Sequence, residues 1–474
     1  MSKDFILIYP PTATRALEFP IGGLHLAHSL LENSFTVGII NEYSEEEILR
    51  LLGQIGPGIP IAFGISIVSG RVMIDAISIA QHLRKSFPDT PIIWGGPHVS
   101  THPEQTLKSS LVDFIINGEG ENSLPKILKA IKSKTDFKDI RGIGYKHNEI
   151  IEITSSAEYS QLDKVFKLPY NLLNIDQYYR KLNIGGDRWL SGLYSRGCPY
   201  KCSFCINSNE NWDNSSVRFH NIDHIVNDIE ILINEYEADG INIMDDHFLI
   251  NEKRVIKICK ELLKRNLNVL YRAAGRVDSL RRMHDDTYQL LKDTGFISIG
   301  AGIESGSPRM LRVINKKITL EDVDYVDSRL SKYGIYKHWN FITALPGETI
   351  EDVRLTLKLI VKLAKTSFDS PYPFNSFVKY IPLPGTRLFK TSVERYGLKE
   401  PCRLEDWGAF SMKYELSNND YDKSIRPWLI GELMYWTNKA LSLVGELNSH
   451  YTGPNADKNK ILESIENIEG FIQT

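Results

Sequence analysis

The chain has 474 residues, of which 42% are hydrophobic and 24% are charged, and its formal net charge is −3. This composition is ordinary for a globular protein of two domains plus an appendage and excludes a disordered chain. The small negative charge and the lack of a long basic run argue against a nucleic acid as partner. No apolar stretch is long enough to cross a bilayer and the N-terminus lacks a signal pattern, so we expect a cytoplasmic protein without a membrane span.

The first part of the chain alternates short apolar strands with amphipathic helices. A helix is predicted at Met73–Phe87, and strands at Phe5–Tyr9, Thr36–Ile40, Ile61–Ile67, Pro91–Trp94 and Val112–Ile116. Such alternation is typical of a parallel, doubly wound sheet. We therefore predict a Rossmann-like α/β domain over residues 1–140, with a ligand at the carboxyl ends of its strands.

Glycines gather in the loops that follow these strands. They occur in Gly64-Ile65-Ser66, in Gly95-Gly96 and in Gly118-Glu119-Gly120-Glu121. A glycine after a buried strand lets the backbone approach a large ligand, because no Cβ stands in the way. Each loop is a weak signal by itself, but together they mark one edge of the sheet as a binding site.

The alternating pattern stops over residues 141–185 and then resumes. A hairpin that turns near Asn148 and an extended connector at Leu168-Pro169-Tyr170 are predicted in this linker. Six βα units follow over residues 186–390. They resemble a partial (β/α)6 barrel, and as in full barrels we expect the chemistry at the carboxyl ends of the strands. These strands are predicted at Leu190–Ser195, Gly240–Met244, Asn268–Ala273, Phe296–Gly302, Lys337–Ala344 and Asn375–Ile381.

Three of the five cysteines follow the first strand of this second unit, as Cys198, Cys202 and Cys205 in the spacing CxxxCxxC. Thiolates this close together select zinc, copper(I) or an iron-sulfur cluster. A structural zinc takes four protein ligands, whereas a four-iron cluster held by three thiolates keeps one iron open. A zinc knuckle completed by a distant histidine and a chance cluster are the alternatives. Cys259 shares an apolar helix face with its neighbours and is expected in the core.

The cysteine spacing, with Phe204 before the last cysteine, resembles that of the radical S-adenosylmethionine (SAM) enzymes. The glycine loops resemble the cobalamin-binding domain that precedes many radical SAM cores. This resemblance implies a [4Fe-4S] cluster on the three cysteines, SAM on the open iron with Phe204 beside it, and cobalamin. It also implies that cobalamin is contacted by Ser66, Gly95, Gly96, Gly118 and Glu119.

One feature of the classical cobalamin signature is missing. Residues 1–140 contain no Asp-x-His-x-x-Gly loop, which supplies the lower cobalt ligand in the classical domain. Its absence fits a cobalamin bound without a protein imidazole below the metal, as is common in radical SAM relatives. The alternative is a domain that has kept the fold and lost the cofactor.

Later strand ends carry further matches to the same family. Asp245 and Asp246 stand where relatives contact the methionyl amine of SAM, although paired acids can also cap a helix. Arg276, in an Arg-x-Asp sequence, could hold the SAM carboxylate or bridge strands through Asp278. Glu304, in Gly-Ile-Glu-Ser, stands where relatives hydrogen-bond SAM, and a carboxylate accepts well from ribose hydroxyls.

Residues 391–474 predict a mainly helical cap over the open side of the barrel, with a membrane-surface helix near Pro427–Leu447 as the alternative. The resemblance implies 5′-deoxyadenosyl radical chemistry and an electron donor such as flavodoxin or ferredoxin. It further implies methyl transfer from methylcobalamin to an unactivated carbon, or to phosphorus, of a small-molecule substrate. A radical SAM enzyme that catalyses a non-methylating rearrangement, cyclisation or oxidation, with or without cobalamin, is the alternative.

Overall fold

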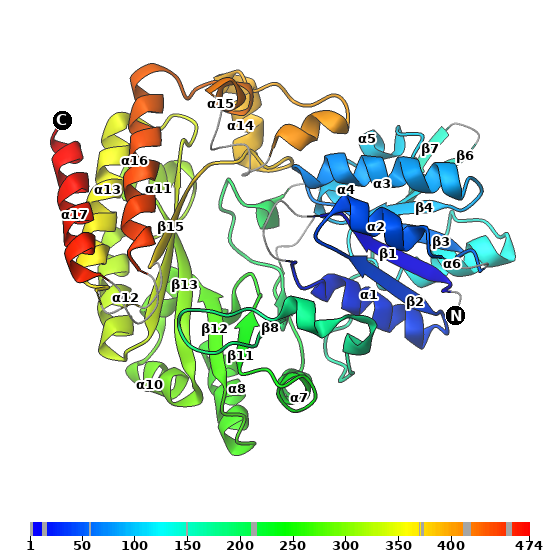
Figure 1. Ribbon diagram of the computed structural model, residues 1–474, viewed down its shortest axis with the longest axis horizontal. Coiled ribbons are helices and arrows are strands. Elements are labelled where there is room, and N and C mark those ends of the chain that lie inside the picture. The colour runs from blue at the N-terminus through cyan, green and yellow to red at the C-terminus, as the bar shows by residue number, and fades with distance from the viewer. Residues whose placement is uncertain are drawn as a thin grey trace.

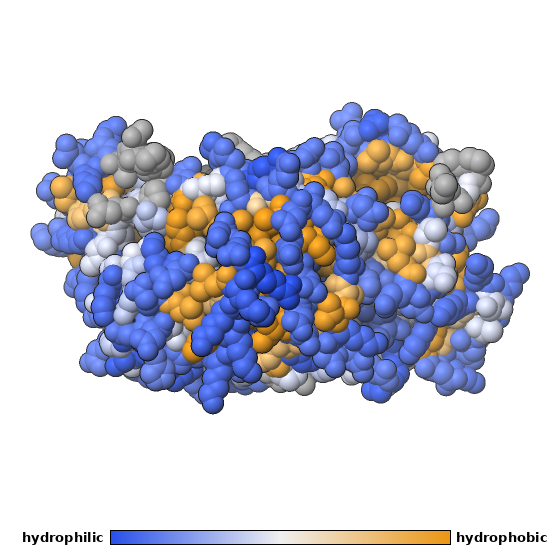
Figure 2. Space-filling view, turned by 90° about the horizontal axis from the view of Figure 1, so that it is seen from below, coloured by the Kyte–Doolittle hydropathy of each residue, from blue (hydrophilic) through white to orange (hydrophobic). Residues whose placement is uncertain are grey.

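Two α/β units lie side by side in the structure, with further helices at the C-terminal end (Figure 1). It is a computed structural model that describes residues 3–11, 17–55, 58–147, 150–209, 216–368, 370, 374–410, 419–451 and 457–474. No helix within these ranges is long and apolar enough to cross a membrane. Hydrophobic and hydrophilic residues are interspersed on the face seen from below (Figure 2).

The first unit is built on a sheet of order β2-β1-β3-β4-β5-β6-β7. Its first five strands pair in parallel, and β6 and β7 add to them antiparallel. All five predicted strands are present, and the predicted hairpin forms β6 and β7, with its turn near Asn148 outside the described residues. The bounds are β1 (Phe5–Tyr9), β2 (Val37–Asn41), β3 (Ala62–Ser66), β4 (Ile92–Gly95), β5 (Phe114–Ile116), β6 (Ile143–His147) and β7 (Ile150–Ile153).

Helices cover both faces of this sheet, as a doubly wound fold requires. One face packs on α1 and α6, through residues such as Leu30 and Ile127, and the other on α2 and α3, through residues such as Ile48 and Met73. Strand β1 is buried on both sides, which explains its unbroken apolar sequence. The helices are α1 (Ile21–Glu32), α2 (Glu45–Leu52), α3 (Val72–Ser86), α4 (Pro97–Thr101), α5 (Pro103–Leu107) and α6 (Leu124–Ser133).

The second unit is an open half-barrel whose strands all run parallel, in the order β15-β14-β13-β12-β11-β8. All six predicted strands are present, so the predicted partial barrel is confirmed. The bounds are β8 (Trp189–Gly192), β11 (Gly240–Ile243), β12 (Leu270–Gly275), β13 (Phe296–Glu304), β14 (Tyr336–Thr343) and β15 (Asn375–Lys379). A short antiparallel pair, β9 (Ser195–Arg196) with β10 (Arg218–Phe219), flanks the cysteine loop.

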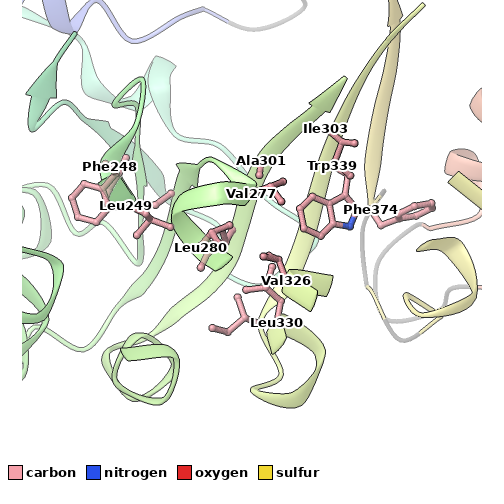
Figure 3. Close-up of a cluster of buried hydrophobic side chains, with 14 of the residues drawn as sticks. Phe248, Leu249, Val277, Leu280, Ala301, Ile303, Val326, Leu330, Trp339 and Phe374 are labelled. Atoms are coloured by element: carbon pink, nitrogen blue, oxygen red, sulfur yellow. The ribbon is translucent and has the colours of Figure 1, made fainter. Parts of the chain in front are cut away.

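Alternate residues of these strands point outward and pack against the surrounding helices. In Figure 3, Ile303 of β13 lies beside Trp339 of β14, and Val326 and Leu330 of α12 lie below them in the same buried cluster. Cys259 on α8 is fully buried, as expected. The helices are α7 (Ile222–Asn234), α8 (Glu252–Lys264), α9 (Val277–Arg282), α10 (Asp285–Thr294), α11 (Pro308–Val313), α12 (Leu320–Lys332) and α13 (Ile350–Lys365).

The C-terminal region is helical, as predicted, and it touches both units. Helices α16 (Gly431–Ser449) and α17 (Lys458–Gln473) lie beside α13, and α16 also contacts the edge strand β15 (Figure 1). The segment after α14 (Arg387–Tyr396) instead reaches back to the first unit, where the indole of Trp407 donates to Gln105 Oε1 at 2.7 Å. Trp407 is fully buried, so it helps to fix the first unit against the second. Helix α15 spans Asn419–Ile425.

Candidate active site

A cavity of about 490 Å³ opens at the carboxyl ends of the half-barrel strands. It brings together residues that lie more than a hundred positions apart in the sequence. Its lining includes every residue predicted to bind the cluster or SAM: Cys198, Cys202, Phe204, Cys205, Asp245, Asp246, Arg276 and Glu304. This volume is within the usual range for small-molecule sites.

The cysteine loop is held in a tight fold by its own backbone. The Cys205 N–H donates to the Cys202 carbonyl at 3.1 Å, and the Ser208 hydroxyl lies within hydrogen-bond distance of the carbonyls of both cysteines. No three His, Cys, Asp or Glu side chains of the described ranges converge closely enough to hold a single metal ion. A four-iron cluster does not need such convergence, because each thiolate binds a different iron. The three thiols on one cavity wall therefore fit a cluster.

Arg276 contacts the cysteine loop directly. Its Nη1 donates to the Cys202 Sγ at 3.2 Å, its Nε to Asp278 at 2.9 Å and its Nη2 to the Lys316 carbonyl at 2.6 Å. Its guanidinium also stacks on the Tyr200 ring, 3.7 Å from the ring centroid. The sequence left two roles open for Arg276, which were to hold the SAM carboxylate or to bridge strands through Asp278. These contacts favour the bridging role, and they add a hydrogen bond to sulfur that the sequence did not predict.

The two adjacent acids after β11 have different surroundings. Asp245 is buried and accepts from the Tyr194 N–H at 2.6 Å and from the Ser195 hydroxyl, so it fixes the strand that leads into the cysteine loop. Burial raises the pKa of Asp245 to about 6. Asp246 is exposed to the cavity. Asp246 is therefore the better placed of the two to meet an ammonium group of a ligand.

Glu304 forms a buried ion pair with Lys316, a residue that the sequence analysis did not single out. The Lys316 Nζ lies 2.8 Å from Glu304 Oε1, and both side chains are less than 10% exposed. The Lys316 ammonium is also 5.9 Å from the centroid of the Phe204 ring. Both groups line the cavity, so they offer a ligand one carboxylate and one ammonium side by side. The lysine follows Glu304 by twelve residues, outside any strand-end motif.

A second cavity, of about 250 Å³, lies at the carboxyl ends of the first sheet. Its lining includes all five residues predicted to contact cobalamin: Ser66, Gly95, Gly96, Gly118 and Glu119. Gly96 and Gly118 have φ angles of 103° and 105°, which favour glycine. Tyr9 also lines the cavity and was not predicted. The described lining contains no histidine, which agrees with the missing Asp-x-His-x-x-Gly loop.

Charged residues join the second cavity to the cysteine loop. Arg196 lines the cavity, lies 2.7 Å from Glu121 and 3.3 Å from Glu119, and precedes Cys198 by two residues. Arg218 also pairs with Glu119. Burial would raise the pKa of Glu121, but the charge and hydrogen bond of Arg196 outweigh burial and lower it. Glu119 therefore ties the two units together as well as lining the cavity.

Known proteins match the chain in the same two parts. The model of the B12 binding domain matches residues 13–128, and that of the radical SAM superfamily matches residues 193–360. An uncharacterised methyltransferase of Pyrococcus horikoshii is 29% identical over 406 residues, 82% of this chain and 83% of that protein. The anaerobic magnesium-protoporphyrin IX monomethyl ester cyclase of Rubrivivax gelatinosus is 24% identical over 383 residues, 78% of this chain and 66% of that protein.

A solved structure shares the whole fold. It is the radical S-adenosylmethionine methyltransferase TsrM from Kitasatospora setae, with a TM-score of 0.70 at 14% sequence identity over 100% of both chains. One matched segment lies within each α/β unit, and the two segments contain the residues of the two cavities singled out from the sequence. The chain therefore combines a B12-binding domain with a radical SAM domain, and the cofactors that these two domains take are cobalamin and a [4Fe-4S] cluster with SAM.

Proposed function

We propose that this enzyme transfers a methyl group to an unactivated carbon, or to phosphorus, of a small molecule. One observation carries the proposal: Arg196 lines the cavity of the first unit, and Cys198, two residues further along the chain, lines the cavity of the half-barrel. Two residues of chain span at most about 7 Å, so the walls of the two cavities come this close at Arg196 and Cys198. The Pyrococcus relative and TsrM, which are both named as methyltransferases, support the same reading.

The bound cofactors supply a carbon-centred radical and a methyl group, and the protein supplies binding and orientation. In this proposal the three cysteines hold the cluster, and Asp246 accepts from the ammonium of the SAM methionine. Lys316 donates to the SAM carboxylate and Glu304 accepts from its ribose. The glycine loops receive the nucleotide tail of cobalamin, since they leave a cavity where side chains would otherwise fill the strand ends.

The Rubrivivax cyclase favours a second candidate, in which the same cofactors serve a reaction without methyl transfer. The two can be separated without knowing the substrate. The full chain is reconstituted anaerobically with iron, sulfide and hydroxocobalamin, reduced, and mixed with SAM. Methylcobalamin on the protein together with S-adenosylhomocysteine supports methyl transfer. Cobalamin that stays bound but is never methylated supports the second candidate.

The cluster assignment has its own control. Replacing Cys198, Cys202 and Cys205 together by alanine should abolish reductive formation of 5′-deoxyadenosine. Cys402→Ala removes an exposed cysteine outside the loop and should leave it unchanged. If the triple variant still forms 5′-deoxyadenosine at the rate of the unaltered chain, the cysteines do not hold the cluster. Loss of all cobalamin on desalting would contradict the role of the glycine loops.

We also propose a cytoplasmic, reducing location and a one-electron donor such as flavodoxin or ferredoxin. All five cysteines are free, which agrees with a reducing compartment. A cluster at the strand ends needs an external electron for each reductive cleavage of SAM, because the described protein groups offer no other redox centre.

A further inference from the structure

The outer side of the cysteine loop is built from segments that carry only positive charge. The Ser203 N–H donates to the Ile314 carbonyl at 2.9 Å, and the Leu388 N–H donates to the Ser203 carbonyl at 2.7 Å. The Asn315 side chain donates to the Lys201 carbonyl at 2.5 Å. Residues 198–205, 311–317 and 386–391 are therefore bound to one another around the loop.

These three segments contain no Asp or Glu. Five of their lysines and arginines are exposed. Because the net charge of the whole chain is −3, this excess of positive charge is local to these segments. We call this the basic surface; its cations are Lys201, Arg312, Lys317, Arg387 and Lys390. Val313 adds an apolar side chain that is 43% exposed beside Arg312. A positively charged surface with an apolar contact is suited to an acidic protein partner.

The basic surface is next to the cluster but outside the cavity. Lys201 adjoins Cys202 in the sequence, so their Cα atoms are about 3.8 Å apart. The cysteine side chains line the cavity, whereas none of the five cations does. A protein bound here would come close to the cluster without blocking the cavity from SAM or substrate.

We infer that the basic surface docks an acidic protein that carries single electrons and delivers them through the cysteine loop to the cluster. This inference rests on the proposed role of Cys198, Cys202 and Cys205. The electron comes from the reduced carrier, which leaves oxidised by one electron, and the cluster gains one electron. No atom is transferred in this step.

The test uses the full chain, reconstituted with its cluster, and chemically reduced flavodoxin as the probe. The variant R312E/K317E reverses two exposed charges, which changes the charge of the surface by four units, and touches no residue of the cavity. The second-order rate of cluster reduction at low salt should fall about tenfold or more, because electrostatic steering commonly contributes tenfold to a thousandfold. Added salt should slow the unaltered chain and bring the two rates together.

Two controls separate docking from other effects. K257E/K260E reverses two exposed charges on α8 and should keep the rate of the unaltered chain. Dithionite and reduced methyl viologen, which need no docking surface, should reduce the cluster of R312E/K317E and support 5′-deoxyadenosine formation within about twofold of the unaltered chain. If dithionite supports no 5′-deoxyadenosine formation with any chain, including the unaltered one, the result contradicts the proposed function and not the docking inference.

The inference is overturned if flavodoxin reduces R312E/K317E as fast as the unaltered chain at every salt concentration. It is also overturned if transfer RNA binds the unaltered chain at physiological salt, R312E/K317E loses that binding, and flavodoxin reduction is unaffected. The surface would then be a nucleic-acid site.

Discussion

The bond from Arg276 to the Cys202 sulfur predicts a measurable effect on the reduction potential of the cluster. Arg276→Met removes a positive charge and an N–H donor that lies 3.2 Å from the sulfur of Cys202, one of the three proposed cluster ligands. Reduction adds negative charge to the cluster, and a nearby cation stabilises that charge. The variant should therefore be harder to reduce, with a more negative midpoint potential.

The size of the shift follows from the contacts. At 3.2 Å and an effective dielectric constant of about 20, bare Coulomb attraction would be about 5 kcal/mol. Asp278, 2.9 Å from the same guanidinium, offsets much of this. The energy of a hydrogen bond to a charged group, about 1.5–3 kcal/mol, is therefore the more realistic value for the stabilisation of the reduced cluster by Arg276. For one electron this corresponds to a shift of about 60–130 mV.

The assay is a redox titration of the reconstituted protein, followed by electron paramagnetic resonance of the reduced cluster. Asp278 keeps Tyr200 as a partner at 2.7 Å, so the variant leaves no orphaned carboxylate. Arg276→Lys should shift the potential less, because it keeps the charge. Arg282→Met is the matched control, since the described hydrogen bonds of Arg282 go to oxygen atoms of Tyr200, Asp278 and Ser279 and not to sulfur. A potential unchanged in Arg276→Met, with the cluster fully loaded, would refute the reasoning.

Three further changes test other parts of the site. Glu304→Ala leaves the Lys316 ammonium buried without its carboxylate partner, so it should lower the unfolding free energy by about 3–5 kcal/mol in urea denaturation. A double variant that also carries Lys316→Met should recover most of this loss. No recovery would show that the ion pair is not the cause. Burial raises the pKa of Glu348 from 4.5 to about 8. The pKa of Glu348 is higher in the folded chain than in the unfolded chain. The contribution of Glu348 to the unfolding free energy is therefore fully present at pH values below its unfolded pKa and is lost as pH rises through about 8. Glu348→Gln should therefore match the unaltered chain in urea midpoint near pH 4 and exceed it near pH 9, and equal midpoints at both would contradict the burial argument. Gly95→Val places a side chain at the edge of the second cavity, where a Cβ would lie 3.7 Å from Ile116 Cβ. The amount of cobalamin bound after desalting should fall about tenfold, while the iron content stays unchanged. Gly445→Val on α16 is the control, and full retention of cobalamin by Gly95→Val would place cobalamin elsewhere.

Much of this fold was predictable because the strands repeat a simple pattern. Parallel strands that are buried on both faces, such as β1, must be apolar throughout, and the sequence shows this directly. Motifs at strand ends were predictable for the same reason, since carboxyl ends of parallel strands meet at one edge of a sheet. Hence the positions of Cys198, Glu304 and Gly95 after predicted strands indicated the sheet edges at which the cavities lie, and the family resemblance supplied the ligand expected at each.

The sequence by itself determined the two α/β units, the cysteine loop and the residue types that line each cavity. Only the tertiary structure decided which polar partners meet: Lys316 with Glu304, Arg276 with the Cys202 sulfur, and Arg196 with Glu121. It also brought Trp407 back to the first unit, 302 residues from its partner Gln105. The physical reason is that periodicity records whether a side chain is buried, whereas the identity of its partner depends on which distant segment the folded chain places beside it.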